Sequence, residues 1–370
     1  MDRLVAFDRA RQQLLARCTA IAETERVAIE QASGRRLGEA CTTAGPYPAR
    51  AVATTDGLAV NSAEGVGASP YNPLPASGVT AVEPGDALPA GSDAVAPWEE
   101  VTAEDGGWML LGEVDAGQGV CRAGQLLGAG DTALEAGRVL GAGDLALLGA
   151  LGGRDTICVY RRPVVTMIFA ASERDVAHRL LWALLAADGA AIGHRAATTA
   201  DALAEALSDA AARSDLVLVV GGTGEGRAGI APQALERAGR LDAHGLALRP
   251  GRAAGLGVVV ECPVVLVPAE PLAALTVGEL LLGPALRLMA GGEEWPHRII
   301  SAPLARKAVS ALGEFGYVRA AFDGERIQPR PSGTDLDLPL LARTDGFVLI
   351  AAESEGHAPG AEVTLYLDRY

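Results

Sequence analysis

Residues 215–224 read DLVLVVGGTG, in which five apolar residues lie between a carboxylate and a glycine-rich turn. A short run of Val and Leu bounded by turn residues is typical of a buried strand. Similar runs occur at 163–171 (PVVTMIFAA) and 262–268 (CPVVLVP), with helical periodicity between them. Strands that alternate with helices predict a parallel sheet covered on both faces. We therefore expect a three-layer α/β domain over residues 158–291.

The connecting segments of this domain support that prediction. AAIGHRA at 190–196 reads as a further strand. Thr199 is a candidate N-cap, because its hydroxyl could accept a backbone N–H of the first helical turn. The predicted helices are RDVAHRLLWALLAAD (174–188), TADALAEALSDAAAR (199–213), APQALERAG (231–239) and the long apolar segment 271–290.

The rest of the chain predicts a multidomain α/β protein. Residues 3–32 carry apolar side chains at helical spacing, and 142–151 predicts a brief helix. Between residues 41 and 135, turn signals every eight to twelve residues predict short strands, and four further β-like runs follow residue 297. The predicted parts are a helical and extended segment (1–40 and 136–157), a β-rich insert (41–135), the α/β domain (158–291) and a small β domain (292–370).

Composition narrows the range of functions. The formal net charge of −15 over 370 residues argues against a nucleic-acid partner, which needs a basic surface. The charge is uneven: residues 158–291 hold 12 Arg and 13 Asp or Glu, so this near-neutral part could accept a polyanion. The five cysteines form no CxxC pair, and the amphipathic start resembles no signal peptide. We expect a reduced, cytoplasmic protein with no membrane role.

The glycine loop after the third predicted strand is the first candidate site. Gly221, Gly222, Gly224 and Gly226 surround Thr223 and Glu225. Glycines let backbone N–H groups approach an anion, and ligands of open parallel sheets bind beyond the carboxyl ends of the strands. A loop whose glycines only relieve crowding is the plainer alternative. A nicotinamide site is a poorer one, because Asp242 follows a helix and ends no second strand.

The second candidate site is the turn Arg249-Pro250-Gly251-Arg252. Paired guanidinium groups suit bidentate contacts with phosphate or other oxyanions. The alternative is a surface turn with two solvated arginines. The histidines at 178, 194 and 244 show no metal-ligand spacing and are expected to be structural or exposed.

Taken together, these motifs resemble the molybdopterin molybdenumtransferases, the MoeA and gephyrin-E family. That family ends a strand in Ser-Gly-Gly, continues to a Lys-Pro-Gly-Lys-Pro turn and then to Pro-Gly-Asn-Pro. It also carries Met-Asp-Gly-Tyr-Ala-Val and Leu-Pro-Glu-Gly-Ala-Asp-Ala-Val upstream. The corresponding segments here are Val-Gly-Gly (220–222), Arg-Pro-Gly-Arg-Ala (249–253), Pro-Ala-Glu-Pro (268–271), Thr-Asp-Gly-Leu-Ala-Val (55–60) and Leu-Pro-Ala-Gly-Ser-Asp-Ala-Val (88–95).

The resemblance covers nearly the whole chain and implies both a fold and a reaction. It implies a molybdopterin-binding-like α/β domain, a C-terminal β-barrel domain and a homodimer. The implied ligands are molybdopterin or adenylylated molybdopterin, a pterin phosphate, together with molybdate and Mg²⁺. The implied reaction inserts molybdate after AMP is released. The resemblance makes Asp56, Glu173 and Glu225 candidate catalytic residues, with Asp56 and Glu225 as metal ligands.

Several positions depart from the family pattern. The family's Ser-Thr-Gly-Asp-Glu is Ala170-Ala171-Ser172-Glu173-Arg174 here, and its Asp-Asp pair near 198 is absent. Both turn lysines are arginines, which keeps the charge but alters the hydrogen bonding. Two functions therefore stay open: an active transferase with relocated carboxylates, or a non-catalytic cofactor-binding carrier or partner of a molybdoenzyme client. An α/β protein that binds another phosphorylated ligand is a third reading.

Overall fold

The computed structural model describes residues 4–104, 106–170, 176–224, 229–292 and 295–369. These residues form two compact units. One unit comprises residues 1–23 and 160–370, and the other comprises residues 24–159. The finer division into four domains stays a prediction.

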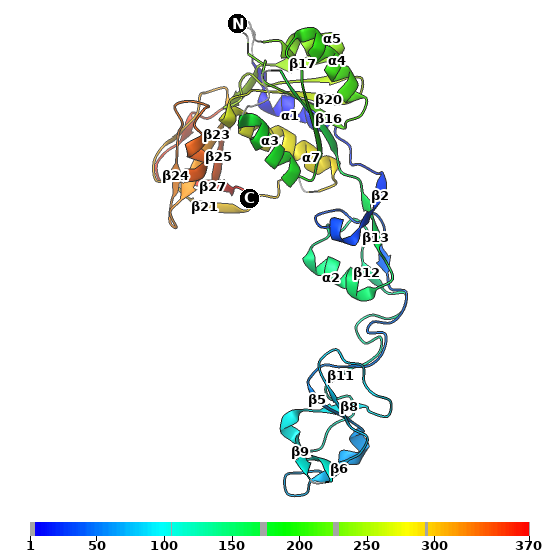
Figure 1. Cartoon of the computed structure of the whole chain (residues 1–370). Helices are drawn as coiled ribbons and strands as arrows, with labels where there is room; N and C mark the ends of the chain where they lie inside the picture. The colour runs from blue at the N-terminus through cyan, green and yellow to red at the C-terminus, as the bar shows by residue number, and fades with distance from the viewer. Residues whose placement is uncertain (1–3, 105, 171–175, 225–228, 293–294, 370) are drawn as a thin grey trace. The chain divides into compact units, whose positions relative to one another are not determined.

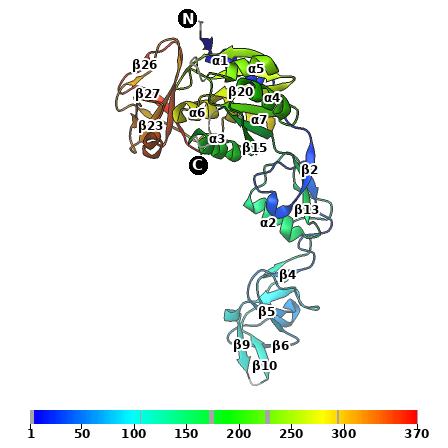
Figure 2. The same ribbon diagram turned by 45° about the horizontal axis from the view of Figure 1, so that its top comes forward.

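The larger unit is built on a six-stranded sheet (Figures 1 and 2). Its order is β15 (Ala191–Ala196), β14 (Val164–Phe169), β16 (Leu216–Val220), β20 (Cys262–Val267), β19 (Gly255–Val259) and β17 (Arg240–His244). The first four strands are parallel, which confirms the predicted α/β sheet. The last two are antiparallel additions.

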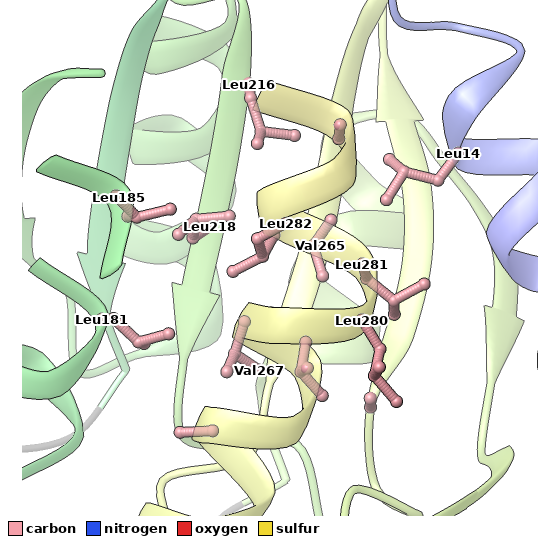
Figure 3. Close-up of a cluster of buried hydrophobic side chains, with 14 of the residues drawn as sticks. Leu14, Leu181, Leu185, Leu216, Leu218, Val265, Val267, Leu280, Leu281 and Leu282 are labelled. Atoms are coloured by element: carbon pink, nitrogen blue, oxygen red, sulfur yellow. The ribbon is translucent and has the colours of Figure 1, made fainter. Parts of the chain in front are cut away.

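Alternation along the strands places two different cores on the two faces of this sheet. Successive side chains of a strand point to opposite faces. Leu216 and Leu218 therefore join the core under α1 (Phe7–Leu15), α3 (Val176–Ala187) and the long helix over residues 271–289 (Figure 3). Val217 and Val219 join the opposite core under α4 (Ala200–Ala211) and α5 (Ala231–Ala238). The predicted three layers are confirmed, and Thr199 Oγ1 accepts from Ala202 N as the predicted N-cap.

The long helix consists of α6 (Pro271–Val277), a π-helical turn η4 (Gly278–Leu282) and α7 (Gly283–Met289). It is long and apolar enough to cross a membrane by length and composition, but 94% of it is buried inside the structure. A buried helix with apolar residues all round is the central helix of a protein core. Leu280, Leu281 and Leu282 are fully enclosed, and burying each contributes about 1.5–3 kcal/mol.

A second sheet in the same unit combines three parts of the chain. Its order is β1 (Val5–Ala6), β18 (Leu246–Arg249), β23 (Phe315–Phe322), β25 (Gly346–Ile350), β27 (Glu362–Leu367) and β21 (Ile299–Pro303), and β24 (Ile327–Pro329) pairs with β23. The described pairings run in a row that ends at β21, so a closed barrel is not confirmed. The unit also contains β22 (Ala308–Val309), paired with β26 (Gly356–His357), and the 3₁₀ helix η5 (Leu338–Arg343).

The smaller unit consists of short strands and turns, as predicted for the insert. Three strand pairs are β2 (Thr24–Ala28) with β13 (Thr156–Tyr160), β3 (Cys41–Thr42) with β12 (Thr132–Leu134), and β4 (Val52–Ala53) with β11 (Val120–Cys121). Two three-stranded sheets are β7 (Thr80–Val82), β5 (Gly57–Val60), β8 (Ala94–Ala96), and β6 (Leu74–Ala76), β10 (Gly107–Leu110), β9 (Val101–Glu104). Its helices are η1 (Ile29–Gln31), η2 (Ser62–Gly65), η3 (Trp98–Glu100) and α2 (Ala142–Leu151), and α2 confirms the brief predicted helix.

The helical prediction for residues 3–32 is wrong beyond the first turns. Helix α1 ends at Leu15, and residues 24–28 form strand β2. The strand forms because its backbone pairs with β13. A partner more than a hundred residues away overrides the local apolar spacing, which periodicity within one segment does not reveal.

Candidate functional site

The glycine loop lies where the sequence placed it, directly after β16. Gly221 N donates to Val267 O at 2.9 Å, and Ala231 N donates to Gly222 O at 3.0 Å. Both glycines are left-handed, with φ of +79° and +64°. A side chain there would cost about 1–2 kcal/mol per residue, so the chain turns from β16 toward α5 at these two positions because they are glycines.

Thr223 is the anchor of this loop. It is buried, and its carbonyl oxygen lies 2.7 Å from His244 Nε2 at the end of β17. The ring nitrogen therefore donates a hydrogen bond, which fixes the loop against the edge strand. Gly224 is exposed. The candidates Glu225 and Gly226, like Glu173, lie outside the described residues.

The arginine turn belongs to the second sheet, because Arg249 ends β18. Strand β18 pairs in parallel with β23, where Arg249 lies opposite Gly316. Arg249 and Arg252 are both exposed and converge on Glu314, whose carboxylate is mostly buried. Arg249 Nη1 lies 4.0 Å from Glu314 Oε2, and Arg252 Nη1 lies 3.8 Å from Glu314 Oε1. One carboxylate thus attracts two exposed guanidinium groups, but at distances too long for hydrogen bonds.

A cavity of about 490 Å³ opens beside Arg249 and Pro250. This volume is in the range of small-molecule sites. Most of its wall comes from the C-terminal segment of the chain, including Lys307, Ser310, Arg330, Ser332, Thr334 and Asp335. None of residues 221–224 is among the described residues that line it. The structure therefore joins Arg249 and Pro250 to a set of polar side chains that the sequence did not single out.

The charges of this cavity are mostly basic. Arg319 also lines it, but Asp368 neutralises that guanidinium through two hydrogen bonds of 2.7 and 2.6 Å. Lys307 and Arg330 are exposed, and no described carboxylate lies within ion-pair distance of either. Together with Arg249, they make a positive wall in a protein whose net charge is −15. Such a wall attracts an anion and raises its local concentration.

One carboxylate lines this cavity, and a second is near enough to act on its charge. Asp335 lines the cavity, and its backbone oxygen accepts from Leu272 N at 2.9 Å. Burial raises the pKa of Asp335, the neighbouring Glu270 raises it further, and Arg249 opposes both. Glu270 belongs to the Pro-Ala-Glu-Pro segment at 268–271. Charged carboxylates that disfavour each other in this way gain from a bound cation or from a proton.

Asp56 belongs to the smaller unit, in the exposed connection between β4 and β5. Thr55 Oγ1 donates to Asp56 O at 3.4 Å. The following Gly57 is required by packing, because its φ is +154° and a Cβ there would lie 2.1 Å from Ala96 O. The Asp-Gly sequence is thus partly explained by the contact of β5 with β8, and the exposed Asp56 remains accessible to a ligand.

No metal centre is complete within the part of the chain that the structure describes. There, no three His, Cys, Asp or Glu side chains are grouped to hold an ion. The proposed ligands Asp56 and Glu225 remain a prediction, since Glu225 lies outside the described residues. The pair Asp335 and Glu270 is compatible with Mg²⁺, which proteins often hold by one or two carboxylates plus substrate phosphates.

Comparison with known proteins gives a consistent result over most of the chain. Residues 5–152 match the "MoeA N-terminal region (domain I and II)", and residues 163–288 match a "Probable molybdopterin binding domain". The chain is 28% identical to molybdopterin molybdenumtransferase 1 of Mycobacterium tuberculosis over 361 residues, covering 83% of each protein. A Methanocaldococcus jannaschii protein assigned to molybdopterin biosynthesis is 28% identical over 165 residues, which are 45% of this chain and only 39% of that protein.

Comparison of the fold with solved structures also finds proteins of molybdopterin biosynthesis. The crystal structure of the molybdopterin biosynthesis MoeA protein of Pyrococcus horikoshii superposes with a TM-score of 0.75 at 25% identity, covering 99% of both chains. A likeness of this extent includes both β-rich parts as well as the α/β domain.

Proposed function

Because the chain belongs to the MoeA family of molybdenum-cofactor biosynthesis, we propose that it inserts molybdate into adenylylated molybdopterin. The observation that carries this proposal is the basic cavity beside the Arg249–Arg252 turn. A phosphorylated pterin and molybdate are both anions, and the cavity offers guanidinium, ammonium and hydroxyl donors to them. We also propose that the protein acts in the cytoplasm as a homodimer, as the resemblance implies.

Each group of side chains has a different role in binding the ligand, according to its chemistry. Arg249 and Lys307 hold an oxyanion, and the mostly buried carboxylate of Glu314 attracts Arg249 and Arg252 toward the same place. Thr334 supplies a hydroxyl donor to the same cavity, and Ser332, whose hydroxyl donates to Thr334 O at 2.5 Å, holds that turn in place. The glycine loop would present its backbone N–H groups to another part of the pterin ligand. Preorganised donors of this kind favour the transition state over the free reactants.

Mg²⁺, when bound, would neutralise phosphate charge and polarise the bond that releases AMP. Asp335 and Glu270 would hold it, together with phosphate oxygens of the substrate. In this proposal the two residues would take the place of the acidic positions that the family has and this chain lacks. Asp56, Glu173 and Glu225 stay candidates for the same role.

Replacement of Arg249 by Gln tests the binding role. The change removes one charge-assisted hydrogen bond, worth about 1.5–3 kcal/mol, so the affinity for a molybdopterin ligand should fall roughly tenfold to a hundredfold. The measurement is a fluorescence titration of the purified variant with molybdopterin. Arg213→Gln is the matched control, because Arg213 is exposed after α4, at the end of the sheet where β16 begins.

Equal affinity of Arg249→Gln and the wild-type protein would remove the cavity from the proposed site. Equal loss in both variants would show a general effect of charge. The carrier function is separated from the transferase by AMP release: a carrier binds the pterin and releases no AMP at any metal concentration.

A further inference from the structure

A second basic groove adjoins the cavity beside Arg249. It has a volume of about 470 Å³ and is lined by Arg306, Arg330, Pro331, Asp337, Leu340 and Arg343. Arg330, Pro331 and Leu340 also line the cavity beside Arg249, so the two hollows share one wall. This groove was not predicted from the sequence, and the resemblance assigns nothing to its arginines.

Three guanidinium groups converge on this groove against one carboxylate. The Arg330 and Arg343 side chains make no hydrogen bond or ion pair with the residues that the structure describes. Asp337 offsets only one of the three positive charges, and its oxygens accept from Leu340 N at 3.2 Å (Oδ1) and from Ser332 Oγ at 3.3 Å (Oδ2) rather than from a guanidinium group. Like charges that converge repel one another, so an anion in the groove would lower the free energy.

Arg306 is held in place before any ligand arrives. Its Nε and Nη2 both donate to Pro329 O, at 3.0 and 2.7 Å. The guanidinium therefore loses less freedom when it binds an anion than a free side chain would. Arg343 is the last residue of η5, whose first turn is capped by Asp337. The groove thus combines one guanidinium group that is already held by a backbone carbonyl with two that are not paired within the described residues.

We propose that this arginine groove binds a phosphate group, either of a phosphorylated small molecule or as free inorganic phosphate. Guanidinium groups match the tetrahedral oxyanion through paired N–H donors, and no apolar surface is needed. The groove adjoins the Arg249 cavity and shares Arg330 with it, but Arg306 and Arg343 line only the groove, and the inference does not depend on the proposed reaction with molybdopterin.

The test is calorimetric titration of the full chain at low salt with inorganic phosphate, pyrophosphate and AMP. Arg343→Gln and Arg306→Gln should each weaken phosphate binding about tenfold, which corresponds to roughly 1.4 kcal/mol. Arg343→Lys should retain part of the affinity, because the charge remains while the bidentate geometry is lost. Arg326→Gln is the control, since Arg326 is exposed in the same domain and does not line the groove.

Tighter binding of AMP than of phosphate would support the groove as a site for an organic phosphate, and equal binding would support it as a site for the free ion. The proposal is overturned if Arg343→Gln and Arg306→Gln bind phosphate as the wild type does, or if Arg326→Gln loses as much. It is also overturned if Arg249→Gln alone abolishes all phosphate binding, because the anion then occupies only the cavity. Circular dichroism of each variant checks that the fold is retained.

Discussion

Asp188 is the centre of a buried charge cluster, and its replacement by Asn gives a direct test of how the larger unit is held together. The carboxylate follows α3 and accepts hydrogen bonds from Arg287 of α7 at 2.9 and 3.1 Å. Arg369, after β27, donates to the same oxygens at 2.6 and 3.2 Å. The cluster therefore links two core helices with the last segment of the second sheet.

The expected cost follows from the burial of these groups. The Asp188 and Arg287 side chains are only 2% and 7% exposed. Removing one partner of a buried ion pair costs about 3–5 kcal/mol, because it leaves an uncompensated charge. Arg369 is 15% exposed and also lies 4.0 Å from Glu279, so it keeps part of its compensation. We expect Asp188→Asn to lower the stability by about 3 kcal/mol, the lower end of that range.

The assay is thermal unfolding followed by circular dichroism, at constant pH and protein concentration. For a unit of this size, about 3 kcal/mol corresponds to a fall in Tm of roughly 6–12 °C. Asp201→Asn is the control, because it breaks the Asp201–Arg237 pair, whose side chains are 87% and 52% exposed. A surface pair contributes at most about 1 kcal/mol. A Tm of Asp188→Asn within about 2 °C of the wild type, or an equal fall in the control, would refute the assignment of the cluster as a structural centre.

Three further results are expected. The pKa of Asp335 is raised in the folded protein, so the wild type loses stability as the pH rises above the unfolded pKa of about 4. Asp335→Asn cannot ionise, so it should raise the free energy of unfolding at pH 7 by less than about 1 kcal/mol and leave it unchanged near pH 3. Denaturant titrations at the two pH values measure this difference. Val260→Asn should raise the free energy of unfolding by about 0.5–1 kcal/mol, and with it the urea midpoint, because Val260 has a φ of +56° in the exposed β19–β20 turn, where Asn is tolerated and a β-branched residue is strained. An unchanged midpoint would argue against strain at this residue. Burial raises the pKa of both Cys18 and Cys262 to about 12, so at pH 8 neither thiol should react with a disulfide reagent until the protein is unfolded, and rapid labelling of the native protein would contradict their burial.

The α/β domain could be predicted from the sequence because its signals are local. Runs such as 216–220 and 262–267 are long enough to read as buried strands, and Thr199 marks a helix start. The pairing of β2 with β13, and of β18 with β1 and β23, could not be predicted in this way. Those contacts join segments that lie far apart in the chain, and no periodicity within one segment encodes a distant partner.

The candidate site, too, could be predicted only where its signals are local in the sequence. The glycines at 221 and 222 were recognised because two glycines directly after an apolar run indicate a turn at the end of a strand, and both have a positive φ in the structure. Lys307, the only lysine of the chain, and the Ser332–Asp335 turn were missed as site residues, although the rarity of lysine was a usable signal. The structure also brings the rings of His178 and His194 to 5.4 Å, which their sequence spacing does not indicate. Contacts between side chains of separate elements, such as α3 and β15, can be identified only when the arrangement of those elements is known.

The most direct test of the central claim is a titration of the purified protein with adenylylated molybdopterin, with and without Mg²⁺ and molybdate, in which pterin binding and AMP release are followed together. We expect tight binding, AMP release only when Mg²⁺ is present, and weakened binding in Arg249→Gln. Binding without AMP release would favour the carrier function over the transferase. The absence of pterin binding under every condition would contradict the proposal that the protein binds and acts on molybdopterin.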